Sequence, residues 1–195
     1  MTSSTLAPVP TVATTMTSSS ASSIYDCNFE QNLCNWSQSI SDDFDWTRNK
    51  GRTSSSDTGP ITDHTTGTDA GFYIFIEVSA PRKPNQKAQI VSANIVTTTT
   101  KCLRFWYHMY GLNIKTLNVY LKSSATPGKL FWTHKGSLSN KWYQAQVDIQ
   151  GNSTYKIMFV AVVGHGVRGD IAVDDITVRE GSCAAPSQIV PVIGK

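Results

Sequence analysis

Apolar and polar residues alternate along much of the chain, with the period of a β-strand that buries one face. The alternating sets are Leu103, Phe105, Tyr107 and Met109; Leu117, Val119 and Leu121; Ala145, Val147 and Ile149; and Tyr155, Ile157, Phe159, Ala161 and Val163. Turn-forming residues such as Tyr110-Gly111 and Gly164-His165-Gly166 separate these sets. No window has the period of a long amphipathic helix. The pattern predicts an all-β, antiparallel β-sandwich of the Ig-like or the jelly-roll kind, and spacing alone does not choose between them.

Composition divides the chain into three parts. In residues 1–23, Ser and Thr make up 13 of 23 positions and no side chain is aromatic or charged. We expect this part to be a disordered linker or stalk, with an expression leader as the alternative, because it cannot bury enough apolar surface to become ordered. The tail, residues 184–195, is expected to be a C-terminal linker. The folded domain is therefore predicted to span residues 24–183.

Charge and hydropathy exclude several classes of function. The chain has 17 Lys and Arg residues and 14 Asp and Glu residues, which gives a formal net charge of +3. A charge this small does not indicate a nucleic-acid-binding protein. No apolar run reaches the length of a membrane-spanning helix. The first residues lack a basic start followed by an apolar stretch, so we expect no signal peptide within this chain.

The four cysteines can pair in three ways. Cys27 and Cys34 lie seven positions apart around a short loop, whereas Cys102 opens one predicted strand and Cys183 follows the last. These positions favour the pairs Cys27–Cys34 and Cys102–Cys183, which are typical of an oxidising compartment. A zinc site is disfavoured because no C-x-x-C pair occurs. Acceptor sequons at Asn35 and Asn152 make these residues candidate N-glycosylation sites and agree with secretion.

Several motifs, in order along the chain, are similar to those of one extracellular family. They are Cys27 to Trp36 (CNFEQNLCNW), Asp45-Trp46, Gly59 to Gly67 (GPITDHTTG), Cys102 to Gly111 (CLRFWYHMYG), and Gly169 to Ile176 (GDIAVDDI) followed by Cys183. Together they resemble the MAM domain of meprins, neuropilins, mu-type receptor tyrosine phosphatases and zonadhesin-like proteins. The resemblance implies a jelly-roll-like sandwich and the same two disulfides.

The resemblance also implies a function. MAM domains are extracellular modules of secreted or membrane proteins that support cell adhesion or oligomerisation, so we expect a protein partner, either a second copy or an extracellular receptor or ligand. Two alternatives stay open: a passive spacer beside a catalytic or receptor domain, and a β-sandwich lectin that binds glycan. Direct insertion into a membrane is not expected of this chain.

Acidic residues within these motifs are candidate ligands for a structural Ca²⁺. Strict alternation sends Asp174 and Asp175 to opposite faces of one strand, so one carboxylate should point inward and needs a partner. Ca²⁺ takes oxygen ligands, and some MAM domains hold a metal ion near the first cysteine loop. The resemblance implies Glu30, Asp63 and Asp174 as ligands, with Asp26 and Asp175 as weaker candidates. The alternative is that backbone N–H groups or Arg satisfy the inward carboxylate.

No motif requires a catalytic role or a cofactor. The run Gly164 to Gly169 fits G-x-G-x-x-G, but it precedes a strand and not a helix, so we interpret it as a hairpin loop. Asp63-His64 lacks the nucleophile elbow and the third group of a hydrolase site. We therefore predict that the domain is not an enzyme. Phe131-Trp132 and Trp142-Tyr143 each place one ring outward, which makes Trp132 and Trp142 candidate interface residues.

Overall fold

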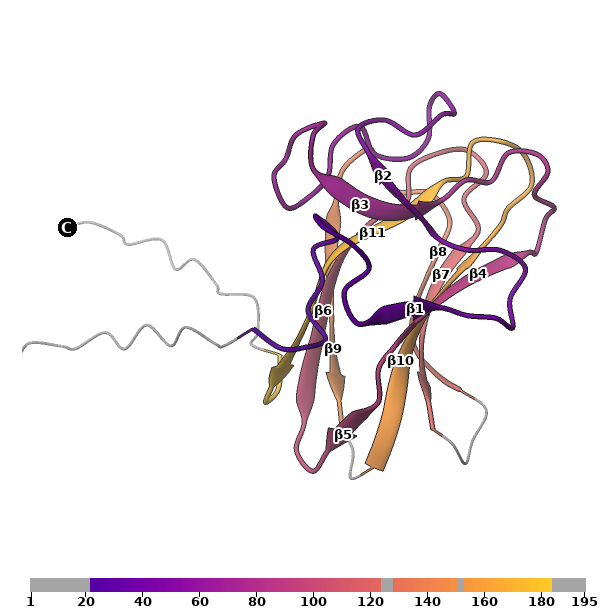
Figure 1. The fold of residues 1–195 in the computed structure, drawn as a ribbon. Helices are drawn as coiled ribbons and strands as arrows, with labels where there is room; N and C mark the ends of the chain where they lie inside the picture. Colours follow the sequence, from indigo (N-terminus) through magenta and orange to yellow (C-terminus); the bar gives the residue numbers. More distant parts are fainter. Residues whose placement is uncertain (1–21, 124–127, 151–152, 184–195) are drawn as a thin grey trace, which may run out of the picture.

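The computed structural model describes residues 22–123, 128–150 and 153–183, which form two antiparallel β-sheets packed face to face (Figure 1). The strands are β1 (Trp36–Gln38), β2 (Thr47–Lys50), β3 (Phe72–Ile76), β4 (Lys87–Ser92), β5 (Ile95–Thr97), β6 (Lys101–His108), β7 (Thr116–Lys122), β8 (Lys129–Lys135), β9 (Tyr143–Ile149), β10 (Ser153–Val162) and β11 (Ile171–Glu180). One sheet has the order β2-β3-β11-β6-β9, and the other β1-β4-β10-β7-β8 with β5 beside β10. The predicted all-β, jelly-roll-like sandwich is confirmed.

The alternating apolar positions meet between the two sheets. Phe105 of β6 and Phe159 of β10 are completely buried, and their rings meet edge to face with centroids 4.8 Å apart. Trp36 of β1 packs on the same Phe159 ring at 5.5 Å. Removing these large apolar side chains from water supplies the main driving force for the sandwich. The period-two pattern therefore marks the strands correctly, because only one face of most strands reaches this core.

Strand β3 departs from that rule, because it is buried on both faces. Ile74 and Ile76 face the core between the sheets, while Tyr73 and Phe75 belong to a second, smaller apolar cluster on the outer side of the five-stranded sheet. Ala172 of β11 completes this cluster and Trp142 packs against it. The outer face of this sheet is thus apolar and requires a cover.

Both predicted disulfides, Cys27–Cys34 and Cys102–Cys183, are present. The first closes the loop that precedes β1, and the second ties the segment after β11 to β6. The expected N-terminal linker, apart from residues 22 and 23, and the expected linker 184–195 lie outside the described residues. In the part of the chain that the structure describes, no segment forms a helix able to cross a membrane.

Asp170 joins three segments at the start of β11. Its side chain is completely buried and accepts a hydrogen bond from the Val78 backbone N–H (3.2 Å), while its own N–H donates to Thr58 Oγ1 (2.9 Å). Burial, and then the nearby charge of Glu77, raise the pKa of Asp170 to about 7. The native state therefore favours the protonated form of this carboxyl group.

The raised pKa of Asp170 predicts a pH dependence of stability. In the unfolded chain the pKa of an Asp is about 3.9. Between that pH and about 7, the carboxyl group of Asp170 is therefore protonated mainly in the native state. The stability linked to Asp170 is present below the unfolded pKa and is lost as pH rises through the folded pKa. Urea unfolding from pH 4 to 8 should show a shallower decline for Asp170→Asn than for the wild type. Equal slopes would contradict this assignment.

The long-range disulfide should contribute more stability than the short one. Cross-linking residues 81 apart removes more chain entropy from the unfolded state than cross-linking residues 7 apart. The expected losses are about 4 kcal/mol for Cys102→Ser/Cys183→Ser and about 2 to 3 kcal/mol for Cys27→Ser/Cys34→Ser. Urea unfolding at neutral pH measures both, with the reduced wild type as the control. A smaller loss for the Cys102–Cys183 pair would contradict the entropic account.

Candidate functional site

The loop between β2 and β3, residues 51–71, covers the outer face of the five-stranded sheet at the top of the view in Figure 1. The His64 ring stacks on Trp106 of β6, with centroids 3.7 Å apart. Trp142 Nε1 donates a hydrogen bond to the Thr62 carbonyl (3.0 Å), and its ring meets Tyr73 edge to face. The loop therefore lies on the sheet through aromatic contacts that sequence alone did not indicate.

Asp63 organises this loop from inside. Its carboxylate is almost completely buried and accepts hydrogen bonds from the Thr66 N–H (2.6 Å), the Thr66 hydroxyl (2.7 Å) and the Thr68 N–H (3.1 Å). Gly71 passes so close that a Cβ there would lie 2.3 Å from Asp63 Cγ. A side chain at position 71 would displace the carboxylate, so glycine is required by this close approach.

Asp174 and Asp175 do not alternate as predicted. A β-bulge interrupts the pairing of β11 with β6 after Asp174, and Asp175 adopts the left-handed conformation with φ 46°. Both carboxylates consequently reach the same loop. Asp174 accepts from the His64 N–H (2.8 Å), and Asp175 Oδ2 lies 2.5 Å from His64 Nδ1. Neither points into the core between the sheets, which corrects the expectation of one inward carboxylate.

Asp174 is nevertheless fully buried, beneath the loop. Burial, and then the adjacent charge of Asp175, raise the pKa of Asp174 to about 8. The Thr65 N–H (3.3 Å) and the Asp175 N–H (2.8 Å) also donate to it. Hydrogen bonds thus satisfy the oxygens of Asp174, but no described Lys or Arg forms an ion pair with it.

Glu30 approaches the same loop from the first disulfide loop. Its Oε1 accepts a hydrogen bond from the Phe72 N–H at 2.8 Å, next to the Gly71 that contacts Asp63. Arg48 of β2 holds the Cys27–Cys34 loop in place, because its guanidinium donates to the Phe29 and Glu30 carbonyls, both at 2.6 Å. Glu30, Asp63 and Asp174 therefore contact one stretch of chain, residues 63–72.

These three carboxylates supply oxygen donors of the kind that Ca²⁺ takes, but in this structure their oxygens are not gathered closely enough to share one ion. Glu30, Asp63 and Asp174 have no cationic partner among the described residues, and two of them are buried. Asp26 lies apart, since its carboxylate pairs with Arg179 Nη1 at 2.5 Å and accepts from the Val178 N–H. Asp175 is paired with His64. The structure thus brings three of the five candidate ligands to one loop and gives the other two partners of their own.

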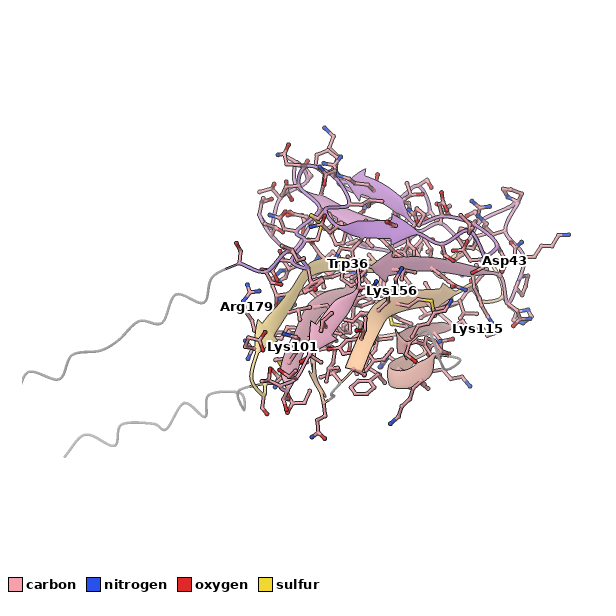
Figure 2. The ribbon with its side chains drawn as sticks, turned by 60° about the horizontal axis from the view of Figure 1, so that its bottom comes forward. Trp36, Asp43, Lys101, Lys115, Lys156 and Arg179 are labelled. Carbon is pink, nitrogen blue, oxygen red and sulfur yellow. A yellow bond between two sulfur atoms is a disulfide. The ribbon has the colours of Figure 1, made fainter. Side chains whose placement is uncertain are left out.

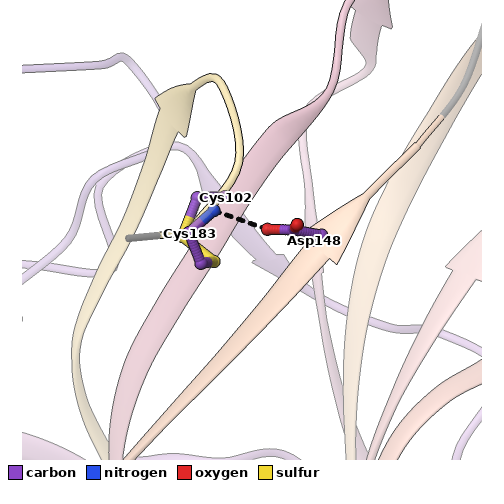
Figure 3. A group of neighbouring side chains, drawn as sticks. All are labelled: Cys102, Asp148 and Cys183. Atoms are coloured by element: carbon purple, nitrogen blue, oxygen red, sulfur yellow. Dashed lines mark hydrogen bonds between the residues drawn. A yellow bond between two sulfur atoms is a disulfide. The ribbon is translucent and has the colours of Figure 1, made fainter. Parts of the chain in front are cut away.

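Among the described residues, the one group of three potential ligands that lies close enough to share an ion contains none of Glu30, Asp63 and Asp174. Within the described residues, the ligand atoms of Cys102, Asp148 and Cys183 lie within 4.8 Å of one another (Figure 3). The two sulfurs are joined in a disulfide, and Asp148 accepts a hydrogen bond from the Cys183 N–H at 2.5 Å. A disulfide sulfur is not a thiolate ligand, so this group is a structural tie between β6, β9 and the segment after β11.

The predicted interface and glycosylation residues occupy different environments. Trp132 and Trp142 are half-buried, and their rings pack on Phe105 (5.1 Å) and Tyr73 (5.8 Å) within the domain. Asn35 is exposed and donates through Nδ2 to the Ile24 carbonyl (2.8 Å). Asn152 lies outside the described residues. None of these four roles is tested by the fold, and each stays a prediction.

Two exposed aliphatic residues lie on neighbouring loops of the sandwich. Leu112 is 75% exposed and Val167 is 55% exposed. They belong to two loops that meet, because the Asn113 N–H donates to the Arg168 carbonyl at 2.7 Å. Sequence analysis did not single them out, since only the pairing of the two loops brings them together.

A family model and several curated proteins match most of the described chain. The sequence model of the MAM domain, meprin/A5/mu, matches residues 27–184. MAM domain-containing glycosylphosphatidylinositol anchor protein 1 of Rattus norvegicus is 38% identical over 181 residues, covering 86% of this chain and 19% of that protein. MAM domain-containing glycosylphosphatidylinositol anchor protein 2 of Homo sapiens is 36% identical over 176 residues, covering 82% of this chain and 18% of that protein. Thyroid hormone-induced protein B of Xenopus laevis is 41% identical, covering 80% and 23%.

Solved structures share the fold at low sequence identity. The K1 cleaved adhesin domain of Lys-gingipain from Porphyromonas gingivalis superposes with a TM-score of 0.59 at 11% identity, covering 80% of this chain and 97% of that one. The K3 domain of the same protein gives 0.57 at 14% identity, covering 80% and 98%. The chain spans about a fifth of the length of the curated relatives. Because the family match covers both disulfides and every strand of the sandwich, the chain belongs to the MAM domain family.

Proposed function

We propose that this chain is a non-enzymatic, extracellular interaction module that associates with a protein partner. The observation that carries the proposal is the MAM match over residues 27–184, together with relatives named as glycosylphosphatidylinositol anchor proteins. Two disulfides support an oxidising, extracellular compartment. Adhesion through a second copy of the domain is the form of the proposal that can be tested with this chain alone.

The loop end with Leu112 and Val167 is the surface that best supports protein contact. Both side chains expose more than half of their surface, and they lie on loops that a rigid sandwich holds in place. Burying such side chains against a partner contributes favourably at about 25 cal/mol per Å² of apolar surface. Trp132 and Trp142 remain candidates for a second contact, although replacing either also removes packing within the domain.

Self-association provides the test. Sedimentation velocity over a wide concentration range should show a concentration-dependent dimer, which Leu112→Ser/Val167→Ser should weaken by about tenfold or more, or roughly 1.4 kcal/mol. The matched control is Val96→Ser/Leu130→Ser, which replaces two exposed aliphatic residues on β5 and β8. A strict monomer at every concentration would contradict self-association and favour a heterologous partner or a passive spacer. Equal weakening by both variants would contradict the loop end as the contact.

We also propose that Glu30, Asp63 and Asp174 hold a structural Ca²⁺. A bound cation would favour the ionised form of Asp174, which burial and then the adjacent charge of Asp175 disfavour. It would also tie the first disulfide loop, the loop 51–71 and β11 together, since one of the three carboxylates comes from each. No substrate position follows from this arrangement, so the ion's role is structural.

Thermal unfolding in excess Ca²⁺ and in EDTA tests this site. A ligand at about a hundredfold excess over its Kd stabilises the native state by about 2.7 kcal/mol. Asp63→Asn and Asp174→Asn should each abolish the Ca²⁺-dependent shift, whereas Asp57→Asn, at an exposed surface pair with Arg168, should preserve it. Identical unfolding of the wild type in Ca²⁺ and EDTA would return the three residues to a hydrogen-bonding role alone.

A further inference from the structure

The outer face of the six-stranded sheet holds an open groove. The groove has a volume of about 810 Å³ and crosses β1, β4, β10 and the end of β7. Ser37, Val91 and Met158 lie side by side on its floor, because Ser37 pairs with Val91 and Val91 with Met158 in adjacent strands. The exposed Ile40 lines one side.

Two lysines lie directly opposite each other in this groove. Lys156 of β10 pairs with Lys122 of β7 in the antiparallel register, and both are exposed. Their side chains point outward, because Tyr155 and Ile157 on either side of Lys156 are buried in the core. Lys156 is labelled in Figure 2. Like charges at directly opposed positions destabilise a β-sheet, so this pair lowers the stability of the free domain.

Nothing in the described residues compensates the two charges. The residues that line the groove include no Asp or Glu. Neither ammonium group forms an ion pair or a side-chain hydrogen bond within the described residues, and all four ion pairs found there lie elsewhere. The groove therefore carries a local positive potential that attracts anions, although the net charge of the chain is small.

We propose that this groove binds a sulfated glycan chain. The Lys122 and Lys156 ammonium groups would contact a sulfate or carboxylate, with which they are complementary in charge. The rest of the lining includes hydroxyl and amide side chains, such as Ser37, Asn94 and Thr154, of the kind that hydrogen-bond the hydroxyl groups of sugars. An acidic peptide would match the charge alone, and the test below distinguishes it from a sulfated glycan. The site is separate from the loop end proposed for protein contact.

The test uses a size-defined heparin oligosaccharide and isothermal titration calorimetry at low and at physiological ionic strength. The wild type should bind, more weakly at higher salt because screening acts on exposed charges. Lys122→Glu/Lys156→Glu should weaken binding by about tenfold or more. Lys83→Glu/Lys135→Glu, which changes two other exposed lysines and the net charge equally, should leave binding within about twofold.

A single substitution separates binding from folding. Lys156→Glu places opposite charges at the paired positions 122 and 156, so its melting temperature should equal or exceed that of the wild type while glycan binding falls. Four results would overturn the proposal: no binding by the wild type, equal loss in both double variants, equal binding of a fully desulfated oligosaccharide, or tighter binding of polyglutamate with the same dependence on Lys122 and Lys156. The last would assign the groove to an acidic peptide. None of these results bears on self-association through Leu112 and Val167.

Discussion

An apolar outer face on the five-stranded sheet is the constraint on which the rest of the structure depends. Tyr73 and Phe75 are buried away from the core between the sheets, so the loop 51–71 must lie over them. A covering loop brings backbone N–H groups into a buried place, where each needs an acceptor. Asp63 and Asp174 accept several of these hydrogen bonds, and Glu30 accepts one at the start of β3. Covering the sheet thus explains why acidic side chains are buried here.

The two outer faces of the sandwich differ as a consequence. On one, three carboxylates without cationic partners among the described residues accept hydrogen bonds from the backbone of residues 64–72. On the other, none of the loops that the structure describes covers the groove, and Lys122 and Lys156 lie opposite each other with no carboxylate in the lining. The opposed lysines cost stability in the isolated domain, and they are suited to a partner of opposite charge. The exposed Leu112 and Val167 belong to neither face but to two neighbouring loops.

Sequence reasoning succeeded where one face of a strand decides the pattern, as in β6 and β10, whose alternating residues fill the core. It did not reveal the cover on β3, although the unbroken apolar run from Phe72 to Ile76 is the signal of a strand buried on both faces. Alternation failed at Asp175, because a bulge with a left-handed residue has no clear mark in the sequence. The opposition of Lys122 and Lys156 depends on strand register, which links residues far apart in the chain.

The central claim is that buried carboxylates hold the loop 51–71 on the sheet by accepting hydrogen bonds from its backbone. Amide hydrogen exchange of this loop tests the claim most directly. The backbone N–H groups of His64, Thr66 and Phe72 donate to Asp174, Asp63 and Glu30. The account predicts that these three amides exchange nearly as slowly as amides inside β3, although two of them lie in a loop. Exchange as fast as that of an unstructured peptide at His64 and Thr66 would contradict it.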